Sequence, residues 1–179
     1  MQRYVALLRG IAPSGRNMTN DKLRGVFEGL GFSDVGSVLA SGNITFCSAD
    51  TDQPTLERRI EEALVDELEV RSTTILRAYP ELRALVDSAP FPGLTHGRGS
   101  YLTATFLKEP AADPAIVRDQ TDPHTRVVRY DQSTRAVLAV TDDTADGPSF
   151  MLWLEKAFGK GITTRSWLTV ERIVRKLQS

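Results

Sequence analysis

The chain has 179 residues, of which 41% are hydrophobic and 25% are charged, and its formal net charge at pH 7 is -1. These values are ordinary for a soluble globular protein with one full core or two small ones. The single cysteine, Cys47, excludes an internal disulfide, and its place in an apolar strand pattern predicts a packed thiol. The chain has no run near ~18 apolar residues and no signal-peptide pattern, so we expect a cytoplasmic protein without a membrane partner.

Charged residues are unevenly distributed along the chain. Residues 1–31 hold five basic residues against two acidic ones, and residues 155–179 hold six against two. Residues 50–69, by contrast, hold eight acidic residues against two basic ones. Two basic ends therefore flank an acidic middle, a distribution that favours an anionic partner at one surface, whereas the acidic run itself is typical of a solvated helix face.

The first 78 residues alternate between strand and helix patterns. Residues 4–8 form an apolar run typical of a strand buried on both faces, and apolar residues at positions 23, 26, 27 and 30 line one face of a helix. Two strands at 35–40 and 44–47, a helix from about Pro54 and a strand at 73–76 come next. This order of strand, helix, strand, strand, helix, strand is the split βαβ, or ferredoxin-like, arrangement.

The rest of the chain repeats this order at low sequence identity. After a linking helix at 80–89, the patterns predict strands at 101–107, 125–130, 135–140 and 162–164, and helices at 115–120, at 149–158 and from Trp167. We therefore predict an α+β fold of two ferredoxin-like units with antiparallel sheets and a C-terminal helix. The predicted boundaries are 1–78 for the first unit, 79–97 for a linking helix and loop, and 98–179 for the second unit with the C-terminal helix.

A basic loop punctuated by glycines comes after the first strand and precedes the first helix; it contains Arg9, Gly10, Gly15, Arg16 and Asn17. In a split βαβ unit this loop, the helix start and the turn between the second and third strands leave the sheet at the same edge. Backbone N–H groups and the helix dipole attract anions there. We therefore predict an anion site, in which Arg9 donates a charge-assisted hydrogen bond and the glycines allow sharp turns or close approach.

The turn expected at this edge is Ser41-Gly42-Asn43, in which Gly42 and Asn43 are predicted to have positive φ. We include all three residues in the predicted ligand-binding site. The alternative is a purely structural role, in which Gly42 and Asn43 only make a turn and Arg9 is only a surface residue.

The same loop resembles a phosphate-binding P-loop, because it follows a strand, precedes a helix and has four residues between Gly10 and Gly15. Arg16 replaces the lysine of that motif, Asn17 replaces its magnesium-ligating hydroxyl, and the helix is expected to begin late, at residues 19–21. A P-loop NTPase is therefore disfavoured. A looser phosphate-binding loop remains open, because glycine lets backbone N–H groups approach an anion and arginine offers a planar fork.

Other chemical motifs are weak. His96 and His124 lie in separate predicted loops without a second ligand at metal spacing, and the aspartates at 142, 143 and 146 match no calcium loop. No arrangement of nucleophile and base is indicated. We therefore predict no metal site and no cofactor, and we assign no catalytic residue.

Residues 163–169 are a second candidate segment. Ser166 is predicted to be the N-cap of the last helix, and Trp167 is expected to pack on the core. Arg165 stays open as a ligand-binding cation. In the alternative interpretation, Arg165 and Trp167 meet a phosphate and a base of nucleic acid. Aromatic residues make up only 7% of the chain and do not cluster on one strand, which weighs against that interpretation.

The segments 7–11, 15–17, 41–43 and 163–169 together resemble the bacterial family catalogued as domain of unknown function 1697. The resemblance covers nearly the whole chain and implies an α+β fold with ferredoxin-like parts, but it implies no activity. The chain departs from the usual pattern at Arg16 (commonly Lys), at Ser166 (commonly Asn) and around 147–149, where a basic residue usually lies close to the serine. If that basic residue serves the family's site, we expect this protein to bind its ligand differently or more weakly.

Two classes of function remain open at this point. The first is a binding module for a phosphate-bearing or other anionic ligand, either a nucleotide or, with weaker support, a nucleic acid. The second is an enzyme that acts on an anionic or phosphorylated small molecule. A deep pocket lined by Arg9 and Asn43 beside a titratable group would favour the enzyme, and an open basic surface would favour the binding module. The patterns leave the oligomeric state undefined.

Overall fold

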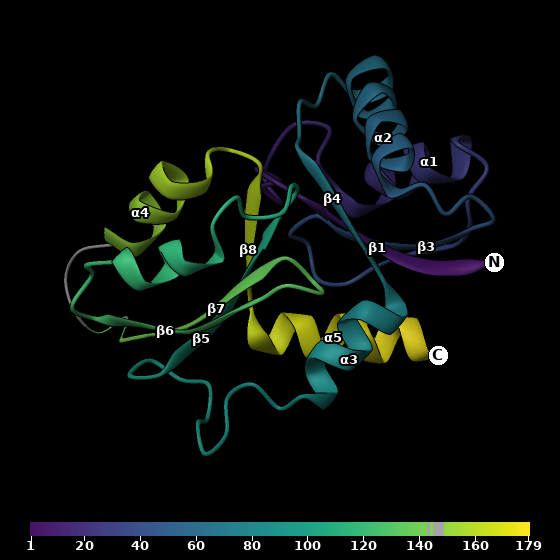
Figure 1. Ribbon diagram of the computed structural model, residues 1–179. Helices are drawn as coiled ribbons and strands as arrows, with labels where there is room; N and C mark the ends of the chain where they lie inside the picture. The colour runs from purple at the N-terminus through teal and green to yellow at the C-terminus, as the bar shows by residue number, and fades with distance from the viewer. Residues whose placement is uncertain (143, 145–148) are drawn as a thin grey trace. The chain divides into compact units, whose positions relative to one another are not determined.

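The computed structural model describes residues 1–142, 144 and 149–179, and its chain divides into two compact units (Figure 1). The first comprises Met1–Leu82 together with Arg172–Ser179, and the second comprises Arg83–Glu171. Helices α3 (Tyr79–Asp87) and α5 (Trp167–Gln178) have residues in both units. This grouping rests on contacts rather than on independent folding, so the boundaries expected from the sequence stay a prediction.

The first unit contains a four-stranded sheet in which every neighbouring pair of strands is antiparallel. Its elements in chain order are β1 (Gln2–Leu8), α1 (Asn20–Gly29), β2 (Ser33–Ser37), β3 (Asn43–Ser48), α2 (Gln53–Leu68) and β4 (Thr74–Ala78). The strand order is β2-β3-β1-β4. Strand β1 is central, and its Leu7 stands opposite Asn43 of β3 and Ile75 of β4.

The core of the first unit forms between one face of this sheet and helices α1 and α2. Alternate residues of β1, namely Tyr4, Ala6 and Leu8, contribute to it because side chains of a strand alternate between faces. The rings of Phe32 and Phe46 stack with centroids 4.4 Å apart. Burying each such large apolar side chain contributes about 1.5–3 kcal/mol.

The second unit repeats this topology. Its elements are β5 (Tyr101–Leu107), the 3-10 helix η1 (Pro114–Asp119), β6 (Thr125–Asp131), β7 (Ala136–Thr141), α4 (Ser149–Phe158) and β8 (Ile162–Ser166). The sheet is antiparallel, in the order β6-β7-β5-β8. Two four-stranded antiparallel sheets with the same order confirm the predicted α+β fold of two ferredoxin-like units.

The structure corrects the predicted connection between β2 and β3. Strand β2 ends at Ser37 rather than at residue 40, and the longer connection places Leu39 at φ 58° and Gly42 at φ 74°. The prediction of positive φ at Asn43 was wrong, because Asn43 is the first residue of β3. The expected helix at 115–120 is the short η1, which begins at Pro114.

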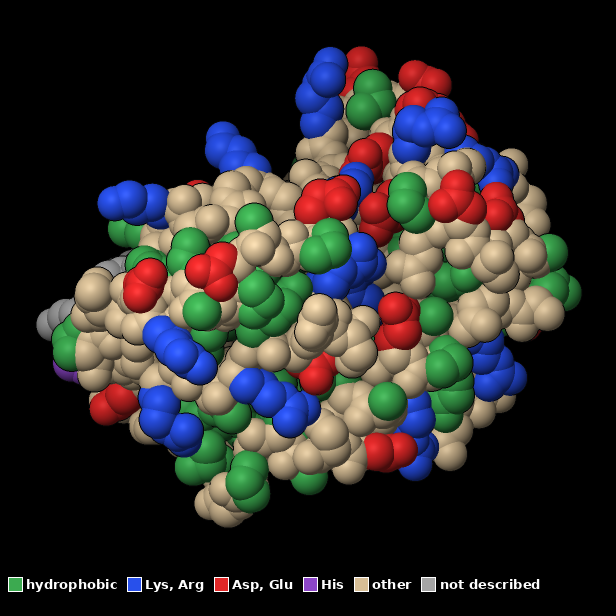
Figure 2. Space-filling model, in the orientation of Figure 1, with side chains coloured by type: hydrophobic (Ala, Val, Ile, Leu, Met, Phe, Trp, Pro, Cys, Tyr) green, Lys and Arg blue, Asp and Glu red, His purple; other side chains and the backbone are tan. Residues whose placement is uncertain are grey.

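The surface charges and the character of the helices both bear on possible partners. Side chains of both charge signs are interspersed over the face drawn in Figure 2. Among the described residues, no helix has the length and apolar character needed to cross a membrane.

Candidate functional site

The end of β1, the start of α1 and the connection between β2 and β3 lie together in the first unit. Leu8 N donates to Gly42 O over 2.8 Å, and Asn20 Nδ2, at the start of α1, donates to Leu39 O over 2.9 Å. Ile11 packs so closely on Gly42 that a Cβ at position 42 would lie 2.7 Å from Ile11 Cγ1. The structure therefore brings together residues 9–17, hereafter the 9–17 loop, and residues 41–43, hereafter the 41–43 turn.

Strand β4 and the residues before it fix the first residue of the 9–17 loop. Arg9 N donates to Thr73 O over 3.0 Å, and Ser72 Oγ donates to Arg9 O over 2.8 Å. Both backbone groups of Arg9 are thus hydrogen-bonded, while its side chain is half-buried. The guanidinium of Arg9 therefore extends from an anchored backbone position.

Two glycines of the predicted site have a left-handed backbone but different surroundings. Gly10 has φ 75° and open space where a Cβ would stand. Gly42 has φ 74° and is enclosed by Ile11 and Leu8. Gly10 thus leaves backbone accessible to a ligand, whereas Gly42 allows two segments of chain to pack.

The two predicted asparagines both bind backbone groups of the protein. Asn17 Nδ2 donates to Leu68 O, the last residue of α2, over 3.0 Å, and its Oδ1 accepts from Lys22 Nζ over 2.7 Å. Asn43 is fully buried, and its Nδ2 donates to Val38 O and to Ser41 Oγ over 2.9 and 3.0 Å. In this conformation both amides hold the 9–17 loop and the 41–43 turn in place.

Residues 9–24 hold four basic side chains, Arg9, Arg16, Lys22 and Arg24, against one acidic side chain, Asp21. Arg16 is exposed, and within the described part of the chain its side chain makes no hydrogen bond or ion pair. Lys22 is tied to Asn17, and Arg24 pairs with Asp21 and donates to Ser37 Oγ over 3.0 Å. Lys22 was absent from the predicted site. Its charge is evident in the sequence, but its bond to Asn17 depends on the turn of the loop.

The N-terminus of α1 offers backbone donors at the same edge. Thr19 is the N-cap residue, but its side chain makes no capping hydrogen bond. The first intrahelical bond runs from Leu23 N to Thr19 O over 3.0 Å. The N–H groups of residues 20–22 accordingly have no intrahelical acceptor, which is the usual basis of anion binding at a helix start.

Arg165 belongs to the second unit, whereas the other predicted site residues belong to the first. Its Nη1 donates to Thr163 Oγ1 and Thr164 O over 2.7 and 2.9 Å, and burial lowers the pKa of its guanidinium to about 10. Beside it, Ser166 Oγ accepts from Thr169 N over 3.3 Å at the start of α5. Trp167 is buried edge-on against Phe91, with ring centroids 5.1 Å apart. Ser166 and Trp167 therefore have the structural roles expected from the sequence.

The structure adds little support for a chemical role of the histidines and aspartates considered above. His96 is half-buried, and its Nδ1 accepts a hydrogen bond from Leu102 N over 3.2 Å. Asp143, Asp146 and most of the 147–149 segment lie outside the described residues. The residues that the structure describes contain no group of three or more His, Cys, Asp or Glu side chains able to hold a metal ion.

Comparisons with known proteins identify a family and a fold. The family model described as "Protein of unknown function (DUF1697)" matches residues 1–137. The search of curated proteins returns no match. A solved structure, that of the conserved bacterial protein SP0830 from Streptococcus pneumoniae, is similar with a TM-score of 0.78 and 21% sequence identity, over 100% of this chain and 99% of that one. At this identity the similarity shows the fold alone.

Proposed function

The chain belongs to the DUF1697 family, whose description states no function, and we propose that it binds a phosphate-bearing or other anionic ligand beside the 9–17 loop and the 41–43 turn. The convergence of these segments on the start of α1, held by the bonds from Leu8 N to Gly42 O and from Asn20 Nδ2 to Leu39 O, carries this proposal. An anion there would meet both uncapped N–H donors and a net positive charge.

Three residues have a role in this proposal. Arg16 donates to the anion from the exposed surface, Arg9 donates from its anchored position, and the backbone at Gly10 lets the ligand approach. Charge-assisted hydrogen bonds to phosphate oxygens are roughly twice as strong as neutral ones. The asparagines hold the two segments and do not need to touch the ligand.

The exposure of Arg16 and the inward position of Asn43 favour a binding module over an enzyme. Arg16 lies on the open surface and the buried amide of Asn43 is turned away from it, whereas turnover of a small molecule usually takes place in an enclosed pocket with titratable groups. A nucleotide fits this chemistry and the cytoplasmic location expected from the sequence. An enzyme acting on an anionic small molecule is the alternative, and turnover of the bound probe would reveal it.

Calorimetric titration with pyrophosphate, ADP and a short single-stranded oligonucleotide tests the proposal. We expect Arg16→Ala and Arg9→Ala each to weaken the affinity for pyrophosphate by about tenfold, the loss of one hydrogen bond to a charged group. Arg58→Ala is the matched control, because Arg58 is an exposed arginine of the same unit that pairs with Glu62 on α2. The Arg58→Ala variant should bind pyrophosphate with the affinity of the wild type.

Two results would contradict the proposal. One is the absence of heat and of thermal stabilisation with every probe. The other is a sharply lower melting temperature of Arg9→Ala with unchanged affinity, which would make Arg9 a structural residue. Tighter binding of the oligonucleotide than of ADP would identify nucleic acid as the ligand class.

A further inference from the structure

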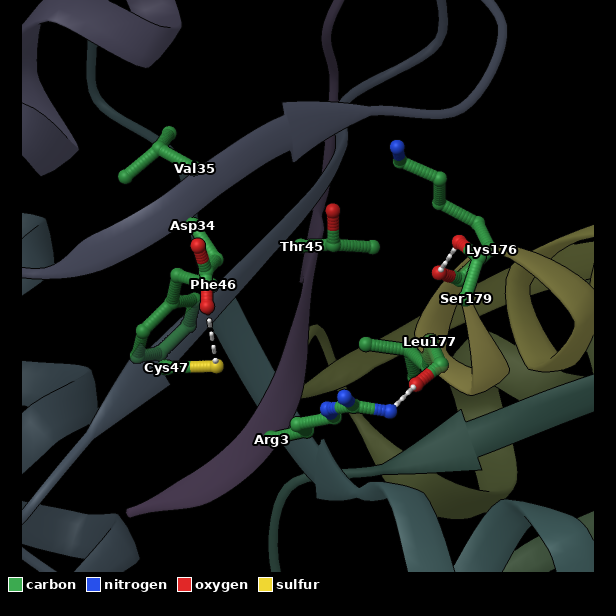
Figure 3. A pocket seen from close by; sticks show the side chains of 9 residues that line it. All are labelled: Arg3, Asp34, Val35, Thr45, Phe46, Cys47, Lys176, Leu177 and Ser179. Carbon is green, nitrogen blue, oxygen red and sulfur yellow. Dashed lines mark hydrogen bonds between the residues drawn. The ribbon is translucent and has the colours of Figure 1, made fainter.

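The first unit contains a second polar feature, a pocket of about 330 Å³ beside the start of β1 (Figure 3). Its polar lining comes from six residues: Arg3, Asp34, Thr45, Cys47, Lys176 and Ser179. All of these residues belong to the first unit, including Lys176 of α5. The volume lies at the lower end of the range for ligand pockets, so the pocket suits a small molecule.

A bulge in the edge strand β2 shapes this pocket. The register of β2 against β3 shifts between Ser33 and Gly36, and Asp34 within the bulge has φ 50°. A Cβ at Gly36 would lie 2.9 Å from Thr45 Oγ1 and 3.2 Å from Lys176 Cε. Bulges of this kind redirect side chains, and here the bulge presents Asp34 while the bare glycine leaves room for Lys176.

One wall of the pocket is acidic. Cys47 Sγ donates to Asp34 Oδ2 over 3.5 Å. Burial raises the pKa of the Cys47 thiol, and the hydrogen bond to Asp34 and the charge of its carboxylate raise it further; together they outweigh the opposing charges of Arg3 and the N-terminal ammonium, so the thiol keeps its proton at neutral pH. Asp34 is therefore the acidic side chain of this wall.

The other wall is basic. Arg3 Nη1 donates to Leu177 O over 2.7 Å and to Gln178 O over 3.3 Å, which leaves Nε and Nη2 as further donors. The Lys176 ammonium makes no hydrogen bond or ion pair within the described residues. In Figure 3, Asp34 and Cys47 lie on one side of Thr45, and Lys176 lies on the other.

We propose that this pocket binds a small zwitterion, an α-amino acid or an amino-carboxylate of similar size. The carboxylate of the ligand lies between Lys176 and Arg3, and its ammonium faces Asp34. A simple anion would satisfy only the basic wall and leave Asp34 as a repulsive neighbour. A simple amine would be attracted by Asp34 but repelled by Lys176 and Arg3.

Three probes of matched size separate the two halves of the ligand. L-alanine is the zwitterion, propionate lacks its ammonium and ethylamine lacks its carboxylate. We expect L-alanine to bind more tightly than either half in calorimetric or NMR titration. We also expect bound L-alanine to slow the reaction of Cys47 with a small thiol reagent, a clean readout because Cys47 is the single cysteine of the chain.

Two substitutions test which wall binds the ammonium and which wall binds the carboxylate of the ligand. Asp34→Asn removes the charge but suits a left-handed backbone, so we expect it to weaken binding of L-alanine by about tenfold and not to weaken propionate. Lys176→Gln should weaken both, while the exposed Arg172→Gln on the same helix should change neither. Lys176→Gln and Cys47 protection still test the proposal if Asp34→Asn is unstable.

The proposal is overturned if L-alanine neither binds nor protects Cys47, or if Lys176→Gln leaves its affinity unchanged. Equal losses for L-alanine and propionate in folded Asp34→Asn would also overturn the assignment of a zwitterion. The pocket shares no residue with the proposed anion site, so Arg16→Ala should leave binding of L-alanine unchanged. Failure of one site therefore does not imply failure of the other.

Discussion

The two units share a hydrogen bond at the end of their first strands but form different structures around it. Leu8 N donates to Gly42 O in the first unit, and Leu107 N donates to Arg135 O in the second, both over 2.8 Å. Both acceptor residues have positive φ, 74° at Gly42 and 50° at Arg135. Both units therefore have the same bond and the same unusual backbone, but only the first has glycine at this position.

The two units differ in the helix after this strand and in the side chain that holds the turn. The first unit continues into the ten-residue helix α1, and the second into the six-residue 3-10 helix η1. The buried amide of Asn43 orders the turn of the first unit, whereas the carboxylate of Asp131 orders that of the second. The proposed anion site, which depends on a helix N-terminus and glycines, thus draws on features of the first unit and not on the fold alone.

The largest expected effect comes from exchanging the residues at the two positive-φ positions. Gly42→Ala should lower the free energy of unfolding by about 3 kcal/mol, because its Cβ would lie 2.7 Å from Ile11 Cγ1 on a left-handed backbone. Arg135→Gly should change it by less than about 1 kcal/mol, since relief of backbone strain offsets the lost bond from Arg135 Nη1 to Lys108 O. Urea unfolding of both variants measures the contrast, and equal effects would show that the two turns are equivalent.

The turn asparagine should have the next largest effect. Asn43→Ala removes a fully buried amide and leaves Val38 O without that donor, so we expect a loss of about 2 kcal/mol. Because this amide does not titrate, the loss should be the same at pH 7 and pH 4. A loss below about 0.5 kcal/mol in urea unfolding would mean that the turn does not depend on this side chain.

The smallest expected effect depends on pH. Burial raises the pKa of the Asp131 carboxyl, but bonds from Thr134 and Ser133 together with the charge of Arg129 outweigh it and hold that pKa below its usual value. A carboxyl with a lowered pKa stabilises the fold above its unfolded pKa of about 3.9 and loses this contribution as the pH falls through the folded pKa. Asp131→Asn should therefore cost about 1 kcal/mol at pH 7 and progressively less below about pH 4.

Urea unfolding across this pH range checks the Asp131 prediction. A cost that stays constant down to the lowest accessible pH would show that geometry, rather than charge, makes Asp131 effective. The Asn43→Ala variant serves as the reference, since its cost is expected to be independent of pH.

Periodicity was sufficient for most elements and insufficient for β2. The helical spacing around Leu23 and the apolar run of β1 led to elements close to those observed, because both bury a regular face. Strand β2, Ser33–Ser37, is a bulged edge strand whose residues are half-buried or exposed. It carries no apolar alternation, so the prediction shifted it toward residue 40.

The sequence by itself determined the order of elements, the doubled topology and the meeting of the 9–17 loop with the 41–43 turn, because local apolar periodicity and chain direction are sufficient for these. Only the tertiary structure decided which polar side chains contact distant parts of the chain. Asn17 bonds to Leu68, 51 residues away, and Lys176 lies against Gly36 across 140 positions. Such partners depend on how distant segments pack, and no local pattern records that packing.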